Sequence, residues 1–354
     1  MSVDDILRQL QGQQIRVPCL FSLSPTWHAR LNPEYDDTVE EAIDTWRRSC
    51  LRDPVSYKRN VAADGAYFTR TMNPGVTKPM MKIVGTLCSW VFAWDDILDF
   101  DEMDFGPEQR ENFREETQQL MRESILGPVS TAEEAKSIAP TFDLVQTFYG
   151  IGASIRNGSK HVAVREFVCQ TLCEYATAAV TMEAAFKQGR IQGLEEYLEN
   201  RMGSSCVYGM IAISLFARDF EIPAWLLDHP WARELMKLVN LMVSLDNDIV
   251  SIHHEIACKH ADNFVILLVH HRGMTPQEAV DHCCQIIRNS YIAFEDLRKK
   301  LLKHAAAYEI EDTARTFVEC CLDVRIGIVN WTYYIPRYFD CQPSESKREV
   351  IISL

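Results

Sequence analysis

Two short motifs carry side chains whose types and spacing suit metal chemistry. In the run N-D-I-V-S-I-H-H-E, Asn247, Ser251 and Glu255 follow one another at intervals of four residues. On a helix this spacing places an amide oxygen, a hydroxyl and a carboxylate on one stripe. All three are hard oxygen ligands, which suit Mg²⁺, an ion that keeps several waters and is usually completed by substrate phosphates. The run therefore predicts a magnesium site on a helix face.

The second motif, W-D-D-I-L-D, contains Asp95, Asp96 and Asp99. Asp95 and Asp99 are one helical turn apart, and the motif follows a strongly apolar run from Ile83 to Trp94. Acids at a helix end are also common on solvated surfaces, so this motif alone leaves both interpretations open. Its place at the end of a buried helix indicates the rim of a cavity. Two such helices suggest one cleft that holds several Mg²⁺ ions and a phosphorylated substrate.

The elements that position these residues are expected to be helices. Apolar residues recur at three- and four-residue intervals along most of the chain, and no period-two strand pattern with hairpin turns is found. Three sequences match a capping box at a helix start, namely Thr38-x-x-Glu41, Thr131-x-x-Glu134 and Thr275-x-x-Glu278. We expect helices over residues 38–50, 79–100, 107–125, 131–157, 160–188, 193–218, 231–257, 276–304 and 308–335. The segment from Arg16 to Pro33 lacks helical periodicity and is expected to run as an extended arm.

The 354 residues show no linker and no charge block, so one large domain is expected, and the helical periodicity predicts that it is all-α. The net charge of −14 argues against nucleic acid or an anionic membrane surface as a partner. An anionic substrate can still bind through bridging Mg²⁺. The 12 cysteines include no zinc-type pair, and we interpret most of them as reduced core residues. No secretion signal or membrane span is found, so we expect a cytoplasmic protein.

Together the two motifs resemble the aspartate-rich motif and the N-D-x-x-S-x-x-x-E triad of class I terpene synthases, the microbial sesquiterpene cyclases in particular. Arg201 lies where that family places an arginine that senses the diphosphate, and Arg337-Tyr338 matches its R-Y pair. Arg30-x-Asn32-Pro33 is similar to its N-terminal segment. Cysteine richness and loop style favour a fungal member.

The resemblance extends over residues 25 to 340 or so and implies a single-domain class I terpenoid synthase fold. That fold is an α-helical bundle around a central active-site cavity. It implies an N-terminal arm, residues 1–35, that closes over the site, an α domain over residues 36–340, and a C-terminal tail over residues 341–354.

The resemblance also implies roles for individual residues. Three Mg²⁺ ions are expected, with Mn²⁺ as an alternative ion, on Asp95, Asp96, Asp99, Asn247, Ser251 and Glu255. Diphosphate binding is expected of Arg201, Asn247, Lys259, Arg337 and Tyr338. The catalytic set is Asp95, Arg201, Arg337 and Tyr338, and the cation pocket is Phe68, Phe92, Ser205 and Trp331. This chain departs from the family at two positions. Relatives often carry Lys or Arg directly before the triad glutamate, where this chain has His254, and Lys259 would take over that role. Ser205 stands where relatives commonly have glycine.

The implied activity is that of a carbon–oxygen lyase acting on a prenyl diphosphate. A Mg²⁺-dependent sesquiterpene synthase would ionise farnesyl diphosphate, release diphosphate and cyclise the carbocation to a hydrocarbon or alcohol. Two alternatives remain open at this point: a trans-prenyl diphosphate synthase, and a non-catalytic helical protein that binds a diphosphate. Antiparallel dimers are frequent in the family, which leaves a homodimer open.

Overall fold

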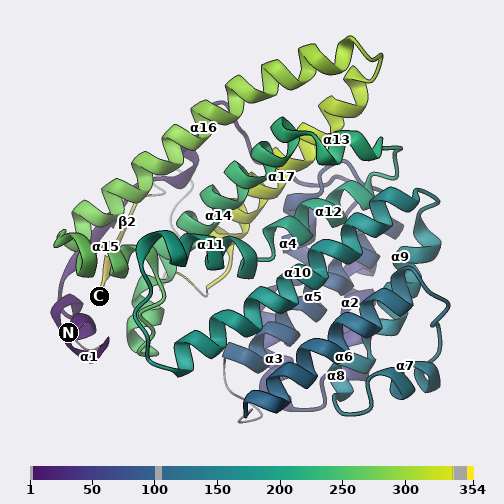
Figure 1. Cartoon of the computed structure of the whole chain (residues 1–354), viewed down its shortest axis with the longest axis horizontal. Coiled ribbons are helices and arrows are strands. Elements are labelled where there is room, and N and C mark those ends of the chain that lie inside the picture. The colour runs from purple at the N-terminus through teal and green to yellow at the C-terminus, as the bar shows by residue number, and fades with distance from the viewer. Residues whose placement is uncertain (1–2, 100–105, 337, 339–348) are drawn as a thin grey trace.

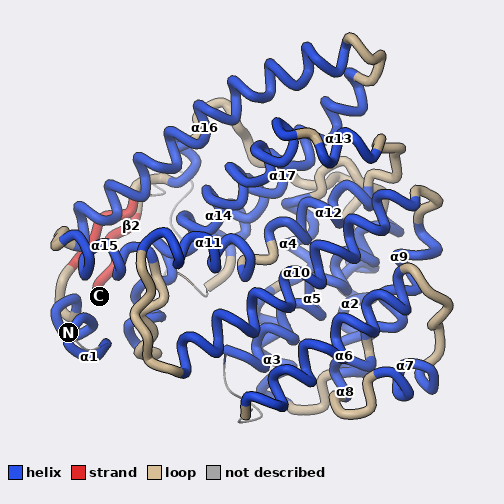
Figure 2. The backbone as a smooth tube through the Cα atoms, viewed as in Figure 1, coloured by secondary structure: helices blue, strands red, loops and turns tan. Residues whose placement is uncertain are grey.

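The computed structural model describes residues 3–99, 106–336, 338 and 349–354, and most of these residues lie in helices (Figure 2). The long helices are α2 (Asp37–Cys50), α5 (Lys78–Asp99), α6 (Pro107–Ile125), α10 (Val162–Lys187), α14 (Pro230–Ala257), α16 (Pro276–Ala306) and α17 (Glu311–Tyr334). The shorter elements are α1 (Val3–Leu10), β1 (Gln14–Val17), the 3₁₀ helix η1 (Leu20–Leu23), α3 (Pro54–Ala63), α4 (Gly65–Met72), α7 (Ala132–Ile138), α8 (Asp143–Gln146), α9 (Phe148–Gly158), α11 (Leu194–Ser204), α12 (Val207–Ala217), α13 (Ala224–Asp228), α15 (Phe264–Arg272) and β2 (Val350–Ser353).

The helices form two groups that share a central layer (Figure 1). In one group α10 packs on α6, α6 on α9, and α5 on α2, α3 and α9. In the other, α14 packs on α16, α17, α15 and α11. Between them α12 contacts α5, α10, α14 and α17. Every residue of α12 except Tyr208 is buried, as expected for a helix that is apolar on all sides. The all-α expectation is confirmed.

Two expected helices are interrupted, and each break has a local cause. The helix expected over residues 131–157 is instead α7, α8 and α9, because Pro140 cannot continue a helix that precedes it. The helix expected over residues 193–218 is α11 followed by α12. Cys206 separates these two with a left-handed φ of 58°, which no α-helix can include. This break places the end of α11 beside the middle of α14.

Two of the three expected capping boxes are confirmed, at Thr131 and Thr275. The third is wrong. Helix α2 begins one residue earlier than predicted, and its N-cap is Asp36, whose side chain accepts a hydrogen bond from the Thr38 backbone N–H. An aspartate in extended conformation satisfies the exposed amides of the first turn as well as a threonine does.

The two ends of the chain lie side by side (Figure 1), joined by a small antiparallel sheet. Strand β1 pairs with β2 in a register that runs from Gln14 opposite Ser353 to Val17 opposite Val350. The all-α prediction did not anticipate these two strands, because strands of four residues give too short a pattern to detect. The arm expected from Arg16 to Pro33 contains the last two residues of β1 and all of η1.

The arm is held to the helices beyond its strand. The Arg30 guanidinium donates to both carboxylate oxygens of Asp323 on α17, over 2.9 and 3.0 Å. The side-chain amide of Asn32, itself buried, donates to the carbonyls of Asn73 and Val76 ahead of α5. The domain limits expected at residues 35 and 340 stay predictions.

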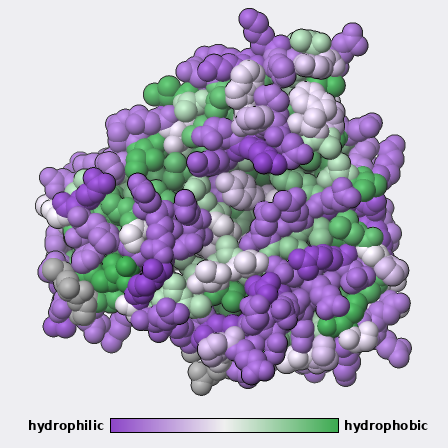
Figure 3. Space-filling view, in the orientation of Figure 1, coloured by the Kyte–Doolittle hydropathy of each residue, from purple (hydrophilic) through white to green (hydrophobic). Residues whose placement is uncertain are grey.

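Polar side chains cover most of the face drawn in Figure 3, and hydrophobic ones appear there in separate areas. Among the described helices, none combines the length and the apolar character that a membrane span needs.

Candidate active site

The three predicted ligands of the second motif lie on successive turns of α14. That helix holds Asn247, Ser251 and Glu255 in one continuous segment. Ser251 is buried, and its Oγ donates to Oε1 of Glu255 over 2.7 Å. The helix thus presents an amide, a hydroxyl and a carboxylate on one stripe, as the spacing predicts.

The surroundings of Glu255 suit a cation. Burial and, after it, the charge of Asp248 raise the pKa of Glu255 to about 8, although hydrogen bonds from Ser251 and Asn263 favour its carboxylate form. A cation would stabilise that carboxylate, and a donor set of hard oxygens alone fits Mg²⁺. Across the described residues, no group of three or more His, Cys, Asp or Glu side chains could hold a metal ion. A metal site on α14 would combine the Glu255 carboxylate with the Asn247 amide oxygen and the Ser251 hydroxyl.

The aspartate motif ends α5, and its first two members have different neighbours. Oδ1 of Asp95 accepts a hydrogen bond from the Tyr175 hydroxyl of α10 over 2.6 Å. Asp96 is buried, and its Oδ2 lies 3.7 Å from the Arg59 guanidinium of α3. Asp99 is the last residue of α5, but its side chain lies outside the described part of the chain. Asp95 is thus held from α10, whereas Asp96 faces α3.

Asp95 also lies close to the break between α11 and α12. Burial and, next to it, the charge of Asp95 raise the pKa of the Cys206 thiol well above its usual value. Since Cys206 directly follows the end of α11, the aspartate motif and the end of the arginine-bearing helix approach each other.

Arg201 connects α11 to the metal-ligand helix. Its Nη2 donates to Oδ1 of Asn247 over 2.8 Å, and its Nε donates to Oδ1 of Asp248 over 3.2 Å. The structure therefore brings together the predicted sensor arginine and a predicted metal ligand from a position 46 residues further along the chain.

Asp248 was not among the predicted site residues, yet it organises this part of the site. Its side chain is buried, and its Oδ2 accepts from the Tyr197 hydroxyl over 2.8 Å and from the Phe264 backbone N–H over 3.0 Å. The Asn263 side-chain amide donates to the Asp248 carbonyl over 2.7 Å and also to Glu255. The sequence carried one signal for this role. Asp248 directly follows Asn247, so on a helix its side chain cannot lie on the stripe of Asn247, Ser251 and Glu255 and must face another part of the protein.

Tyr338 contacts the Asn247 amide at its nitrogen, whereas Arg201 contacts it at its oxygen. Its hydroxyl accepts a hydrogen bond from Nδ2 of Asn247 over 3.1 Å. The Tyr338 ring packs edge-on against Trp331, with the ring centroids 5.9 Å apart. Arg337, the other half of the predicted pair, lies outside the described residues.

The three predicted aromatic pocket residues form one cluster, although they come from α4, α5 and α17. The Phe68 ring centroid lies 5.3 Å from that of Phe92 and 4.9 Å from that of Trp331. Phe92 and Trp331 stack at 5.8 Å with an interplanar angle of 8°. This packing needs Gly327 on α17, because a Cβ there would lie 2.6 Å from the Cα of Met72 on α4. The cluster continues through Tyr338 to Asn247.

Ser205 ends α11 as its C-cap. Its Oγ lies 2.8 Å from Oδ1 of Asn240 on α14, and the Asn240 side-chain amide donates to the Met202 carbonyl over 2.7 Å. The structure thus places Ser205 at the link between the two helices.

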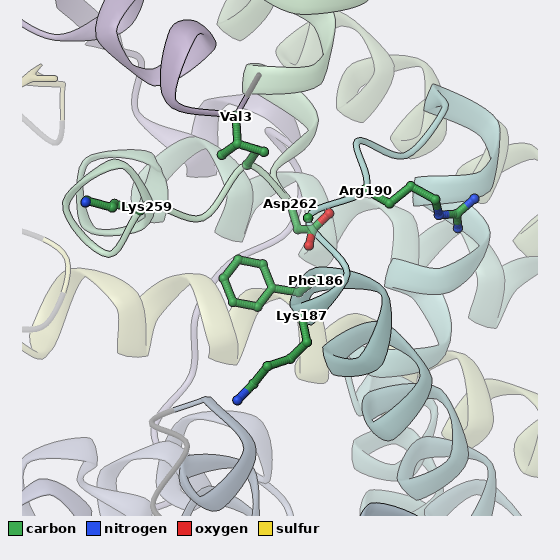
Figure 4. Close-up of a pocket in the computed structure, with 8 residues that line it drawn as sticks. Val3, Phe186, Lys187, Arg190, Lys259 and Asp262 are labelled. Atoms are coloured by element: carbon green, nitrogen blue, oxygen red, sulfur yellow. The ribbon is translucent and has the colours of Figure 1, made fainter. Parts of the chain in front are cut away.

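Lys259 lies apart from the other predicted residues. It follows the end of α14 with a left-handed φ of 61°, and it is exposed. It borders a pocket of about 330 Å³ that Phe186, Arg190 and Asp262 also line. Its side chain points away from Phe186 and Asp262 (Figure 4). Of the predicted diphosphate-binding residues described, Arg201 and Tyr338 form hydrogen bonds with Asn247, whereas Lys259 stands at this separate pocket.

Residues 86–293 match the family model described as "Terpene synthase family 2, C-terminal metal binding". A terpene cyclase of Annulohypoxylon truncatum is 24% identical over 357 residues, which cover 99% of this chain and 92% of that protein. A sesquiterpene cyclase of Aspergillus oryzae is 26% identical over 337 residues, covering 93% of this chain and 90% of that protein.

Solved structures share the fold. A crystal structure of a-eudesmol synthase superimposes with a TM-score of 0.74 at 16% identity, over 87% of this chain and 97% of that chain. The linalool/nerolidol synthase of Streptomyces clavuligerus gives a TM-score of 0.71 at 20% identity, over 86% and 98%. The expected class I α-helical fold is confirmed.

Proposed function

Because the chain belongs to the terpene synthase family, we propose that it is a Mg²⁺-dependent sesquiterpene synthase that acts on farnesyl diphosphate. It ionises this substrate, releases diphosphate and cyclises the carbocation to a hydrocarbon or alcohol. The family match favours this reaction over chain elongation by a trans-prenyl diphosphate synthase and over a non-catalytic diphosphate-binding role. The sesquiterpene cyclase of Aspergillus oryzae, similar over nearly the whole chain, supports the substrate choice.

One observation supports the site assignment above the others. The single amide of Asn247 accepts from Arg201 and donates to Tyr338. Two residues proposed to bind diphosphate thus meet at one residue proposed to bind metal, and they come from distant parts of the sequence. Ser251 and Glu255 continue the same face of the helix.

Mg²⁺, when bound, supplies Lewis-acid stabilisation of the charge that grows on the departing diphosphate. The residues that would hold three such ions, or Mn²⁺ in their place, are Asp95, Asp96, Asp99, Asn247, Ser251 and Glu255. The diphosphate oxygens would accept hydrogen bonds from Arg201, Arg337, Tyr338 and Lys259. Donors fixed before the reaction stabilise developing charge without having to reorganise at that moment.

The aromatic cluster serves the second half of the reaction. A carbocation needs surroundings that are apolar and free of nucleophiles, and the faces of Phe68, Phe92 and Trp331 attract cations through their quadrupoles. The indole N–H of Trp331 donates to the Ala63 carbonyl over 2.8 Å, which fixes the orientation of the ring. Ser205, between α11 and α14, would transmit diphosphate binding from Arg201 toward this cluster.

We also propose a cytoplasmic location and a homodimer. The described cysteines are all free thiols, and eight of the eleven are buried, which fits a reducing compartment.

The direct test incubates the protein with Mg²⁺ and, in separate reactions, geranyl, farnesyl and geranylgeranyl diphosphate. Volatile products are identified by mass spectrometry, and released diphosphate is measured in parallel. We expect cyclic C15 products from farnesyl diphosphate. Consumption of added isopentenyl diphosphate would instead support a prenyl diphosphate synthase, and no Mg²⁺-dependent release of diphosphate would support a binding protein.

A further inference from the structure

Both ends of the Asn247 amide are bound by protein groups. Its oxygen, the atom that can coordinate Mg²⁺, accepts the hydrogen bond from Nη2 of Arg201 over 2.8 Å. Its nitrogen donates to Tyr338, so the amide cannot turn over without losing both partners. The ligand oxygen therefore points at a guanidinium.

Arg201 is fixed in this position by a buried carboxylate. Its Nε binds Asp248, whose side chain is 1% exposed and is held by Tyr197 and by the Phe264 backbone N–H. An arginine guanidinium does not lose its proton in proteins, and the buried Asp248 carboxylate pairs with it directly. The guanidinium thus keeps its positive charge beside Asn247.

The other two ligands are engaged as well. Ser251 donates to Glu255, and Asn263 binds the second oxygen of Glu255. The donors in these contacts, the Ser251 hydroxyl and the Asn263 amide, are neutral, so a divalent cation can displace them from Glu255 without electrostatic repulsion. The contact with Arg201 differs because a divalent cation on the Asn247 oxygen would stand next to a fixed positive charge. Like charges at this range oppose each other strongly when little water separates them.

We propose that Arg201 is a latch on the Asn247–Ser251–Glu255 site, which it keeps closed to a divalent cation until a diphosphate draws the guanidinium away. This proposal rests on the proposed function and adds the order in which diphosphate and metal bind. Diphosphate must engage Arg201 before this site takes its ion with full affinity. By linkage, an ion at this site strengthens diphosphate binding by the same factor.

The experiment measures Mn²⁺ binding to the full chain by the loss of the electron paramagnetic resonance signal of free Mn²⁺, with and without inorganic pyrophosphate. Wild-type protein is compared with Arg201→Gln, whose neutral amide can still donate to Asp248. We expect Arg201→Gln to bind one Mn²⁺ at least tenfold more tightly than wild type in the absence of pyrophosphate. Adding Asn247→Ala to this variant should abolish the gain, which locates the ion on α14.

Arg190→Gln is the matched control, since Arg190 is half-exposed and pairs with Glu196 on α11 away from Asn247. It should bind Mn²⁺ as wild type does. If Arg201→Gln fails to fold, as judged by circular dichroism, the double variant Arg201→Gln with Asp248→Asn replaces it, because it removes the guanidinium charge without leaving a buried carboxylate unpaired. Mn²⁺ affinity unchanged in the folded Arg201 variant would overturn the latch. Failure of wild type to bind Mn²⁺ even with pyrophosphate would instead overturn the proposed function.

Discussion

The Tyr197 hydroxyl donates to Oδ2 of Asp248 over 2.8 Å, behind the ligand face of α14. The other oxygen of the same carboxylate binds Arg201, which in turn binds Asn247. One buried carboxylate therefore sets the position of the arginine relative to the ligand helix. Neither Tyr197 nor Asp248 belongs to the residues expected to touch the diphosphate.

Replacing Tyr197 by Phe should destabilise the fold. It removes one donor from a buried carboxylate, and such losses cost about 1–3 kcal/mol. Chemical denaturation should show this decrease in the free energy of unfolding. Tyr308→Phe is the control, because Tyr308 is 59% exposed and should leave the stability within about 0.5 kcal/mol. Equal stability of the Tyr197 and Tyr308 variants would contradict the role given to this hydroxyl.

Asn247→Ala and Glu255→Ala should each lower turnover by roughly a hundredfold or more while the fold is retained, since each removes a proposed metal ligand. Asp95→Ala should be comparably severe, and Asp99→Ala is expected to be milder. Steady-state release of diphosphate from farnesyl diphosphate measures the effect. Asn289→Ala, on an exposed face of α16, serves as the matched control and should keep wild-type turnover. Wild-type turnover by the Asn247 or Glu255 variant at ordinary Mg²⁺ concentrations would remove the metal assignment.

Metal binding at Glu255 should depend on pH. Its pKa of about 8 lies above the ordinary value of 4.5, so the metal-free carboxyl is mostly protonated at pH 7. A bound cation requires the carboxylate and therefore releases a proton. Below pH 8 the apparent affinity for Mn²⁺ with pyrophosphate should rise roughly tenfold per pH unit, and it should level off above. Calorimetry in two buffers with different ionisation heats counts the protons released, and Glu255→Gln should release one fewer. Identical proton release by the variant would refute the assignment.

The raised pKa has the opposite consequence for the stability of the metal-free protein. A carboxyl with a higher pKa in the folded state than in the unfolded state stabilises the fold when protonated. This contribution is fully present below about pH 4.5 and is lost as the pH rises through about 8. Saturating metal should reverse the trend.

Mg²⁺ and inorganic pyrophosphate together should raise the melting temperature more than either does alone. Ligands that bind only the folded state stabilise it by mass action, by about 2.7 kcal/mol at one hundred times Kd. Differential scanning fluorimetry with each ligand and with both measures the shift. Asn247→Ala should lose most of the joint effect. No shift at saturating concentrations of both would argue against a working site.

The sequence predicted the ligand stripe well because its geometry is local. Spacing of four residues fixes one face of a helix, and α14 begins one residue before the expected position and ends where expected. Spacing does not say which other helix meets that face. The contact between Arg201 and Asn247 depends on the left-handed turn at Cys206, which directs α11 against α14, and cysteine is not a residue that signals such a turn.

Helices α3 and α15 were not predicted, because their sequence signals were either overlooked or weak. Helix α3 starts with Asp53 as N-cap and Pro54 in its first turn, a recognisable start that precedes only ten residues. Helix α15 is buried over Phe264–Leu268 and then ends in basic residues, so it shows no helical period. The cluster of Phe68 with Trp331 needs the close approach of α4 and α17 at Gly327, which no local pattern predicts.

Phe92→Leu should change which products form more than how fast diphosphate leaves. Phe92 stacks with Trp331 and packs edge-on against Phe68, and all three belong to the proposed cation pocket. One cation–π contact is worth roughly 0.5–2 kcal/mol, enough to redirect competing carbocation paths several-fold. Less cyclised hydrocarbons or alcohols should increase, while diphosphate release stays near the wild-type rate. Trp331→Leu should act in the same direction, with added destabilisation from the loss of its hydrogen bond to Ala63.

The measurement is the product spectrum normalised to diphosphate released. Phe113→Leu is the control for core packing, because Phe113 is fully buried on α6 against Trp94 and Phe142, outside the aromatic cluster. It should lower stability without changing the products. Arg337→Ala should mainly lower the rate, since that residue is proposed to bind diphosphate. If Phe92→Leu left the spectrum unchanged while Arg337→Ala altered it, the division between ionisation and cyclisation would have to be reversed.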